Sequence, residues 1–255
     1  MTSIISIHLK KFSNWAKGLL GKHTIFRQAT VICLMGILLW LIYLAASWGF
    51  ADFLAGKVHH TMQQWETQEE LTTEAWQSTH ATLARARYFD THHPSLSEAT
   101  GQSYYLLSNS NTITPAEKLM ALQQALDYYL KSAKQKTASS YTWANIAIVK
   151  ARLGQYDAQL LEALEYATLL GPWEPFVQRA VVDVGLAAWY RFPKEKRKKG
   201  RQIVFEAIER GMQKPTNKQA GLMGQLIKRH QREWVICAYS GTTGKIADFC
   251  QSIGR

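Results

Sequence analysis

The chain has 255 residues, with 30 lysines and arginines against 19 aspartates and glutamates, and its formal net charge is +11. The positive charge is concentrated at the two ends: five cations precede residue 28, and residues 191–255 contain 15 Lys and Arg against 5 Asp and Glu. Once a basic tail and an apolar segment are set aside, about 200 residues remain, which excludes a chain too short to bury a hydrophobic core of its own.

The first element in chain order is a basic N-terminal segment, residues 1–28. Its apolar residues recur at three- and four-residue spacing: Ile5, Leu9, Phe12, Ala16 and Leu19. This spacing predicts an amphipathic helix lying at a membrane surface on the cytoplasmic side. A disordered basic tail is the alternative, because Gly18 and Gly21 weaken the end of such a helix.

An uncharged segment follows, with no Asp, Glu, Lys, Arg or His in residues 29–51. As a helix it reaches roughly 34 Å, and the hydrocarbon layer of a bilayer is about 30 Å thick. We therefore predict a transmembrane helix at residues 29–53. A cleaved signal peptide is the alternative, because small residues at 45–47 offer a cleavage site, but both the charged lead and the apolar run exceed the usual signal-peptide lengths.

The charges that flank the apolar segment predict its direction. The cations before it are Lys10, Lys11, Lys17, Lys22 and Arg27. Directly after it come Asp52 and then Lys57 alone. Because cytoplasmic flanks carry the excess of Lys and Arg, the N-terminus is expected in the cytoplasm and the remainder of the chain outside it.

Beyond the anchor the sequence predicts an all-α fold, because its apolar residues follow the helical period between breaks of Pro, Gly, Ser, Thr and Asn. The expected helices are 71–90, 96–107, 115–134, 142–153, 157–170, 174–190, 196–212 and 218–230, with two shorter ones at 232–239 and 244–252. Thr114 is the expected N-cap of the third, with Pro115 at its first position.

Prolines near the expected helix ends suggest a repeated unit. Pro94, Pro172 and Pro215 are 78 and 43 residues apart, and Lys136-Thr137-Ala138 falls where the longer interval would divide. A unit of about 34–44 residues made of two helices is typical of helical-repeat proteins. Residues 57–255 are therefore expected to form one domain of helical hairpins.

Residues 143–172 resemble a tetratricopeptide repeat. The matching positions are Trp143, Ile146, Ala147, Gly154, Tyr156, Ala167 and Pro172. Two departures mark the repeat as divergent: Lys150 replaces an aromatic residue, and one residue is inserted between Tyr156 and Ala167. The resemblance implies a superhelix of αα-hairpins, and a hairpin unrelated to the family is the alternative.

A second resemblance covers about residues 30–252 and is strongest at 140–190. It is carried by the sequences KARLGQYD at 150–157, LGPWEPFVQ at 170–178 and DVGLAAW at 183–189, together with the basic N-terminus and the single span. These features resemble the VpsP family of polysaccharide biosynthesis proteins, found in exopolysaccharide gene clusters of Gram-negative bacteria. The resemblance implies an accessory protein anchored in the inner membrane, with a helical domain in the periplasm.

The sequence around Trp173 can be interpreted locally. Gly171 is expected to end a helix in the left-handed conformation, and Pro172 prevents that helix from continuing. Trp173 then falls at a hairpin junction, where packing between hairpins is favoured over an exposed platform for a sugar. Packing is likewise favoured for Trp143 and Trp189.

No catalytic motif is recognised: the chain has no Gly-rich phosphate loop, GxSxG, HExxH or CxxC sequence. Asp157 and Glu162 fit a helix start and a solvated face better than an acid–base pair. The doublets His59-His60 and His92-His93 do not suit one metal ion, because adjacent helical residues point about 100° apart. We therefore expect no catalytic, cofactor-binding or metal site.

Cys33 lies in the apolar segment, whereas Cys237 and Cys250 both lie beyond it. A pair of cysteines in an oxidising compartment suggests a disulfide. The alternative is that both are small buried apolar residues.

The densest charge run forms a candidate interaction patch, expected in an exposed loop and first helical turn. Its cations are Lys194, Lys196, Arg197, Lys198, Lys199 and Arg201. The expected compartment excludes nucleic acid, which leaves anionic lipid, an anionic glycan or an acidic protein surface. A simply solvated surface is the alternative.

Two classes of function follow. The first is a non-enzymatic scaffold for protein components of a polysaccharide synthesis or export machinery at the inner membrane. The second is a hydrolase or transferase acting on the polymer. A tetratricopeptide-type assembly factor of a pilus, secretion or cytochrome system would use the same architecture as the first. The sequence has no recognisable pair of catalytic acids, and this favours the scaffold.

Overall fold

The computed structural model describes residues 2–67, 71–91, 93–213, 217–239 and 244–254. It contains α-helices and one short 3-10 helix, with no strand in these ranges. The chain divides into two compact units, Met1–Asp52 and Phe53–Arg255. The all-α class predicted from the sequence is confirmed, as is the long apolar N-terminal helix.

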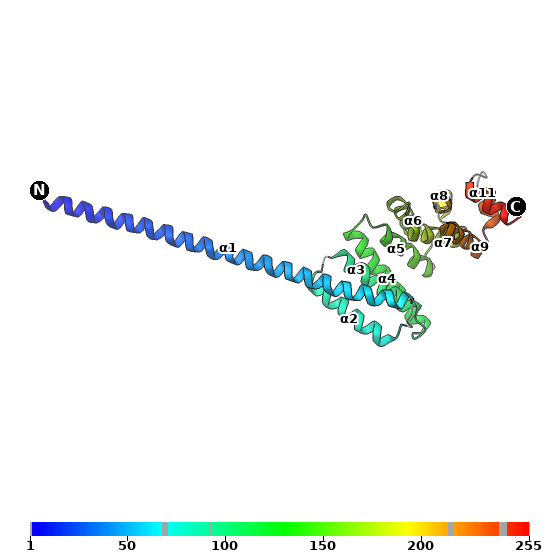
Figure 1. The fold of residues 1–255 in the computed structure, drawn as a ribbon, viewed down its shortest axis with the longest axis horizontal. Coiled ribbons are helices and arrows are strands. Elements are labelled where there is room, and N and C mark those ends of the chain that lie inside the picture. Colours follow the sequence, from blue (N-terminus) through cyan, green and yellow to red (C-terminus); the bar gives the residue numbers. More distant parts are fainter. Residues whose placement is uncertain (1, 68–70, 92, 214–216, 240–243, 255) are drawn as a thin grey trace. The chain divides into compact units, whose positions relative to one another are not determined.

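Helix α1 runs without interruption over Thr2–Thr67 (Figure 1). Within it, Arg27–Trp65 is long and apolar enough to cross a membrane, by length and composition, and its most apolar window is not buried inside the protein. The predicted amphipathic face of residues 1–28 concerns side chains that lie outside the described set, although the backbone there is helical.

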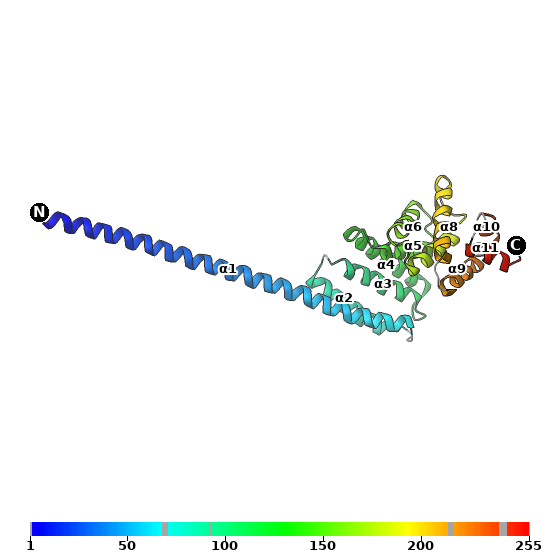
Figure 2. The same cartoon turned by 45° about the horizontal axis from the view of Figure 1, so that its top comes forward.

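The last part of α1 differs from the sequence prediction, in which no helix lies between residues 54 and 70. In the second unit, residues 53–67 lie next to α2 in both views (Figures 1 and 2). Val58 and Met62 are fully buried there, and Trp65 packs on a small cluster around Leu71 and Leu107. These three positions are spaced i, i+4 and i+7, which is one face of a helix.

The ten other α-helices of the described residues correspond to the ten that the sequence predicts, with ends that differ by a few residues. They are α2 (Thr73–Phe89), α3 (Pro94–Asn109), α4 (Pro115–Gln135), α5 (Ser140–Arg152), α6 (Ala158–Leu170), α7 (Pro175–Ala187), α8 (Arg197–Gln213), α9 (Asn217–Arg229), α10 (Glu233–Tyr239) and α11 (Gly244–Ser252). A 3-10 helix, η1 (Lys194–Lys196), precedes α8.

Side-chain caps fix the starts of α2, α4, α5 and α6. At α4, the Thr114 hydroxyl accepts a hydrogen bond from the Glu117 N–H at 3.3 Å, and Glu117 accepts one from the Thr114 N–H at 2.7 Å. This reciprocal pair is a capping box, with Pro115 in the first turn as predicted. The Glu117 carboxylate also accepts a hydrogen bond from the Thr114 hydroxyl at 2.8 Å. The bonds that it accepts from the Thr114 N–H and hydroxyl hold the pKa of Glu117 below its ordinary value, although burial acts in the opposite direction.

The second unit is a chain of packed helices. Sequence neighbours pack against each other from α2 to α11, and alternate helices also meet, with α5 on α7, α6 on α8 and α7 on α9. One hydrophobic core runs from α4 to α11, with Leu126, Ile146, Leu164, Leu186 and Ile208 among its buried members. Each hairpin thus covers the apolar face of the next.

Two glycines permit close packing in this core. A Cβ on Gly185 of α7 would lie 2.1 Å from Val204 Cγ2 of α8, so the two helices approach too closely for any side chain at this position. A Cβ on Gly171 would lie 2.6 Å from Ser140 Oγ. Gly171 has φ −136°, so the expected left-handed conformation is wrong. A close approach, and not a left-handed helix end, explains this glycine.

The three tryptophans singled out in the sequence differ in their surroundings. Trp189 is fully buried, and Trp143 stacks on Tyr166 with ring centroids 4.7 Å apart. Packing is therefore confirmed for these two. Trp173 is 54% exposed, so the favoured expectation that it packs between hairpins is wrong. It lies in the turn before α7, where its ring is open to solvent.

The C-terminal helices are held by a covalent bond as well as by packing. Cys237 of α10 and Cys250 of α11 are joined by a disulfide, with their Cα atoms 5.8 Å apart. Helix α11 also contacts α8, and its Ile246 and Cys250 are buried in the main core. Cys33 is free and exposed.

Candidate functional site

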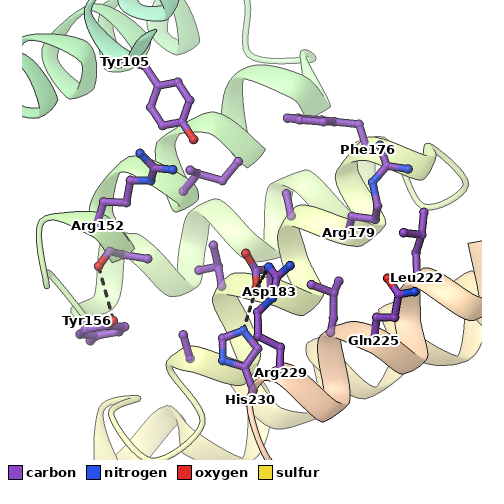
Figure 3. Close-up of a pocket in the computed structure, with 16 residues that line it drawn as sticks. Tyr105, Arg152, Tyr156, Phe176, Arg179, Asp183, Leu222, Gln225, Arg229 and His230 are labelled. Atoms are coloured by element: carbon purple, nitrogen blue, oxygen red, sulfur yellow. Dashed lines mark hydrogen bonds and ion pairs between the residues drawn. The ribbon is translucent and has the colours of Figure 1, made fainter. Parts of the chain in front are cut away.

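A hollow of about 500 Å³ opens between α3, α5, α7 and α9 (Figure 3). A second hollow of about 590 Å³ shares Tyr105, Ile148 and Phe176 with the first, so the two adjoin along α3 and α5, and together they are called the groove. Volumes of this size are typical of ligand sites. The groove is therefore the candidate site. Its arginines lie at the α5, α7 and α9 end, and one acid and one lysine, Glu98 and Lys136, line the second hollow.

Three alternate helices each contribute one arginine to the groove. Arg152 lies on α5, Arg179 on α7 and Arg229 on α9, and Figure 3 shows all three around the same hollow. Because a guanidinium group stays charged at any physiological pH, three permanent positive charges line this surface.

Neutral groups hold two of these arginines in place. The Arg152 guanidinium lies over the Tyr105 ring, 4.7 Å from its centroid, and donates to Asn109 Oδ1. Arg179 donates to Gln219 Oε1 at 3.4 Å. Within the described ranges, neither arginine pairs with a carboxylate. Their N–H donors are therefore not bound to any carboxylate of the described residues.

The first hollow contains one acid, Asp183, one turn after Arg179 on α7. Its Oδ1 is 2.7 Å from His230 Nε2 and 3.9 Å from Arg229 Nη1 (Figure 3). Asp183 is within hydrogen-bond distance of His230 and forms a longer ion pair with Arg229, so it neutralises only one of the three guanidinium charges. The groove therefore has a net positive charge and favours an acidic ligand.

Aromatic residues complete the lining. Phe176 stacks on Tyr141 with ring centroids 5.6 Å apart, and Arg191 lies over the Tyr156 ring at 4.8 Å while donating to the Tyr156 hydroxyl at 2.9 Å. Stacked Arg–Tyr pairs restrict the side chains, which reduces the entropy lost when a ligand binds.

Lys150, which departs from the tetratricopeptide pattern, is a structural residue. It is 2% exposed, and its Nζ donates to Gln155 Oε1 at 3.1 Å, Asp157 Oδ2 at 2.9 Å and Gln159 Oε1 at 2.9 Å. All three ammonium donors are satisfied, so the lysine closes the α5–α6 turn with hydrogen bonds where the pattern uses an aromatic ring.

Asp157 is both the partner of Lys150 and the N-cap of α6, accepting from the Leu160 N–H at 3.0 Å. Burial alone raises the pKa of Asp157, but the Leu160 N–H and the Lys150 ammonium outweigh it, so the pKa lies below the ordinary value. The stabilisation from the ionised carboxylate is therefore present above the ordinary pKa and is lost as pH falls through the folded-state pKa.

We predict that Asp157→Ala lowers the free energy of unfolding by about 2 kcal/mol, because it removes both the cap and the partner of a buried ammonium. Asp157→Asn keeps the cap and should cost about 1 kcal/mol. Urea unfolding at neutral and acid pH checks this. The difference in free energy of unfolding between wild type and Asp157→Asn should become smaller at acid pH. A difference that is independent of pH would contradict the assigned ion pair.

The predicted basic patch divides into two kinds of residue. Lys194, Lys196, Lys198 and Lys199 are exposed, in η1 and the first turn of α8, and Lys199 pairs with Glu165 at 2.7 Å. Arg197 and Arg201 are half-buried and donate to the Tyr190 and Trp189 carbonyls, each at 3.3 Å. The segment is helical from residue 194 on, and not a loop.

In the part of the chain that the structure describes, no group of three His, Cys, Asp or Glu residues lies close enough together to hold a metal ion. His80 instead stacks on Trp76, with ring centroids 4.8 Å apart. Burial, with a contribution from Arg87, lowers the pKa of His80, which favours its neutral form. His92 lies outside the described residues.

No protein-family model matches this chain. No curated protein matches its sequence either. Membership of the VpsP family therefore stays a prediction from the sequence.

The groove residues were missed by the sequence analysis. They form no local motif and come from three helices and the turn after α9, so only the folded arrangement brings them together: Arg152, Arg179, Asp183, Arg229 and His230. The arginines are 27 and 50 residues apart, so they give no periodic signal either.

Proposed function

We propose that this protein is a single-pass, inner-membrane accessory protein of exopolysaccharide biosynthesis or export, of the VpsP type, and that it acts as a scaffold. In this proposal residues 1–28 lie in the cytoplasm, residues 29–53 cross the membrane and residues 57–255 form a periplasmic domain. That domain binds acidic segments of other components of the polysaccharide machinery.

The observation that carries the proposal is the arginine-lined groove. Three alternate helices each provide one guanidinium, so the positive charges are spread along the groove and not gathered at one point. An elongated acidic partner can meet such a surface along its whole length, whereas a small substrate would meet one part of it.

The contacts of alternate helices support a tetratricopeptide-like arrangement. In stacked αα-hairpins the first helix of each hairpin meets the first helix of the next, as α5, α7 and α9 do here. These are the helices that contribute the groove arginines, so the proposed binding face follows the direction of the repeat.

A membrane anchor suits this role, since it keeps a scaffold close to membrane-embedded partners. The apolar helix Arg27–Trp65 provides the candidate anchor, and the five cations before it favour a cytoplasmic N-terminus. We propose no catalytic role, because the proposed scaffold role requires none and the sequence offers no catalytic motif.

Deletion of the gene is expected to abolish or shorten the secreted polysaccharide, and the wild-type chain should restore it. The double charge-reversal variant Arg152→Glu/Arg179→Glu should fail to restore the polysaccharide, because the groove then repels acidic partners. Its matched control is Lys131→Glu/Lys218→Glu, which changes the same charge at exposed positions outside the groove lining. Polymer amount and length distribution are measured in each strain.

Co-purification from crosslinked membranes identifies what the groove holds. Loss of protein partners in the Arg152→Glu/Arg179→Glu variant alone supports the scaffold. Equal restoration of the polymer by both double variants would contradict a role for the groove. Turnover of the polymer by the purified full chain would make the protein an enzyme and overturn the proposal.

A further inference from the structure

A second cluster of arginines surrounds Tyr190, in the segment that joins α7 to α8. The Cζ atoms of Arg201 and Arg232 lie 5.6 Å and 4.9 Å from the Tyr190 ring centroid. Arg197 Nη2 donates to the Tyr190 carbonyl at 3.3 Å. Arg201 comes from α8 and Arg232 from the turn before α10, so the fold brings these residues together from three parts of the chain. The neighbouring Arg191 instead reaches Tyr156.

These three guanidinium groups lack acidic partners. Among the residues described, none of the ion pairs involves Arg197, Arg201 or Arg232. All three side chains are half-buried, where an uncompensated charge is costly. A lysine could lose its proton in such a place, but a guanidinium cannot, so an anion from outside the chain would compensate the charge of the cluster.

Two buried donors in the cluster point to the same conclusion. The Nε atoms of Arg197 and Arg232 are shielded from solvent and have no hydrogen-bond partner. An unsatisfied buried N–H destabilises the folded state, and a shift of either side chain toward an acceptor on a ligand would remove that penalty. Tyr190 itself is 55% exposed, so the cluster is open to a ligand from solvent.

We infer that Arg197, Arg201 and Arg232 around Tyr190 form a binding site for a phosphate or pyrophosphate group. A phosphate monoester carries close to two negative charges and three acceptor oxygens, which allows it to meet several guanidinium groups at once. A single carboxylate offers two oxygens and one charge. The site is separate from the groove and does not depend on the proposed scaffold role.

Isothermal titration of the full chain in a neutral detergent tests this site, with inorganic pyrophosphate as the probe. Saturable binding is expected, and Arg232→Gln should weaken it by roughly tenfold or more, as expected for one charge-assisted hydrogen bond. Arg201→Gln should act similarly. Because Arg201 also holds the Trp189 carbonyl and its loss could disturb folding, Arg232→Gln is the deciding variant.

The matched control is Lys198→Gln, which removes one exposed positive charge from the same basic run and should change the affinity little. A soluble short-chain phosphatidic acid is titrated in parallel. Affinity equal to that of pyrophosphate supports recognition of the phosphate group alone, and tighter binding of the lipid supports a lipid-borne phosphate. The absence of saturable pyrophosphate binding, an equal loss in Lys198→Gln, or tighter binding of a galacturonate oligomer would each overturn the inference.

Discussion

Replacing Gly185 with alanine is expected to lower the free energy of unfolding by about 3 kcal/mol, near the upper end of typical overpacking costs. The new Cβ would lie 2.1 Å from Val204 Cγ2, and Val204 is fully buried and cannot turn into solvent. Helices α7 and α8 must therefore separate. Since α7 also carries Arg179 and Asp183, the separation should disturb the groove.

The control for this prediction is Gly221→Ala in α9. No atom lies within 4 Å of a Cβ built at Gly221, so alanine meets no obstacle and should stabilise the helix by about 0.5–1 kcal/mol. Chemical denaturation of the detergent-solubilised chain measures both variants. Two variants of equal stability would show that α7 and α8 do not approach as closely as described.

Removing the disulfide is expected to have a similar effect, lowering the free energy of unfolding by about 3 kcal/mol in the Cys237→Ala/Cys250→Ala variant. The bond closes a segment with a sequence separation of 13, and it joins α10 to the buried face of α11. Without it, the unfolded chain regains loop entropy and α11 can leave the core.

Maleimide labelling checks the same bond directly. The denatured chain should label only at Cys33 until a reductant is added, after which Cys237 and Cys250 also react. Cys33→Ser is the control, because this free, exposed thiol takes no part in the bond and its loss should not change stability. Labelling of Cys237 and Cys250 without reductant would contradict the pairing.

The helices could be predicted because local chemistry sets their ends. Thr114 with Glu117 forms a capping box, Pro115 and Pro175 lie in first turns, and Asp157 caps α6. These signals act over three or four residues and can be read from the chain alone. The i, i+4 spacing of Val58 and Met62 also indicates that α1 continues, but the predicted helix ends with the membrane anchor.

The rest depends on contacts between distant parts of the chain. Gly171 carries a signal for a helix end, yet its role comes from Ser140 of another helix. Trp173 looks like a residue to be buried, but it is 54% exposed. Likewise, nothing near Arg201 in the sequence indicates that Arg232 contacts the same ring, that of Tyr190.

Membrane topology tests the central claim most directly, because the proposed scaffold must lie outside the cytoplasm. Alkaline phosphatase fused after Gly56 or at Arg255 is expected to be active, and a reporter that works only in the cytoplasm is expected to be inactive at the same points. Neutralising the five cations before the span should reduce phosphatase activity. Reversed reporter activities would place the helical domain in the cytoplasm and contradict the account.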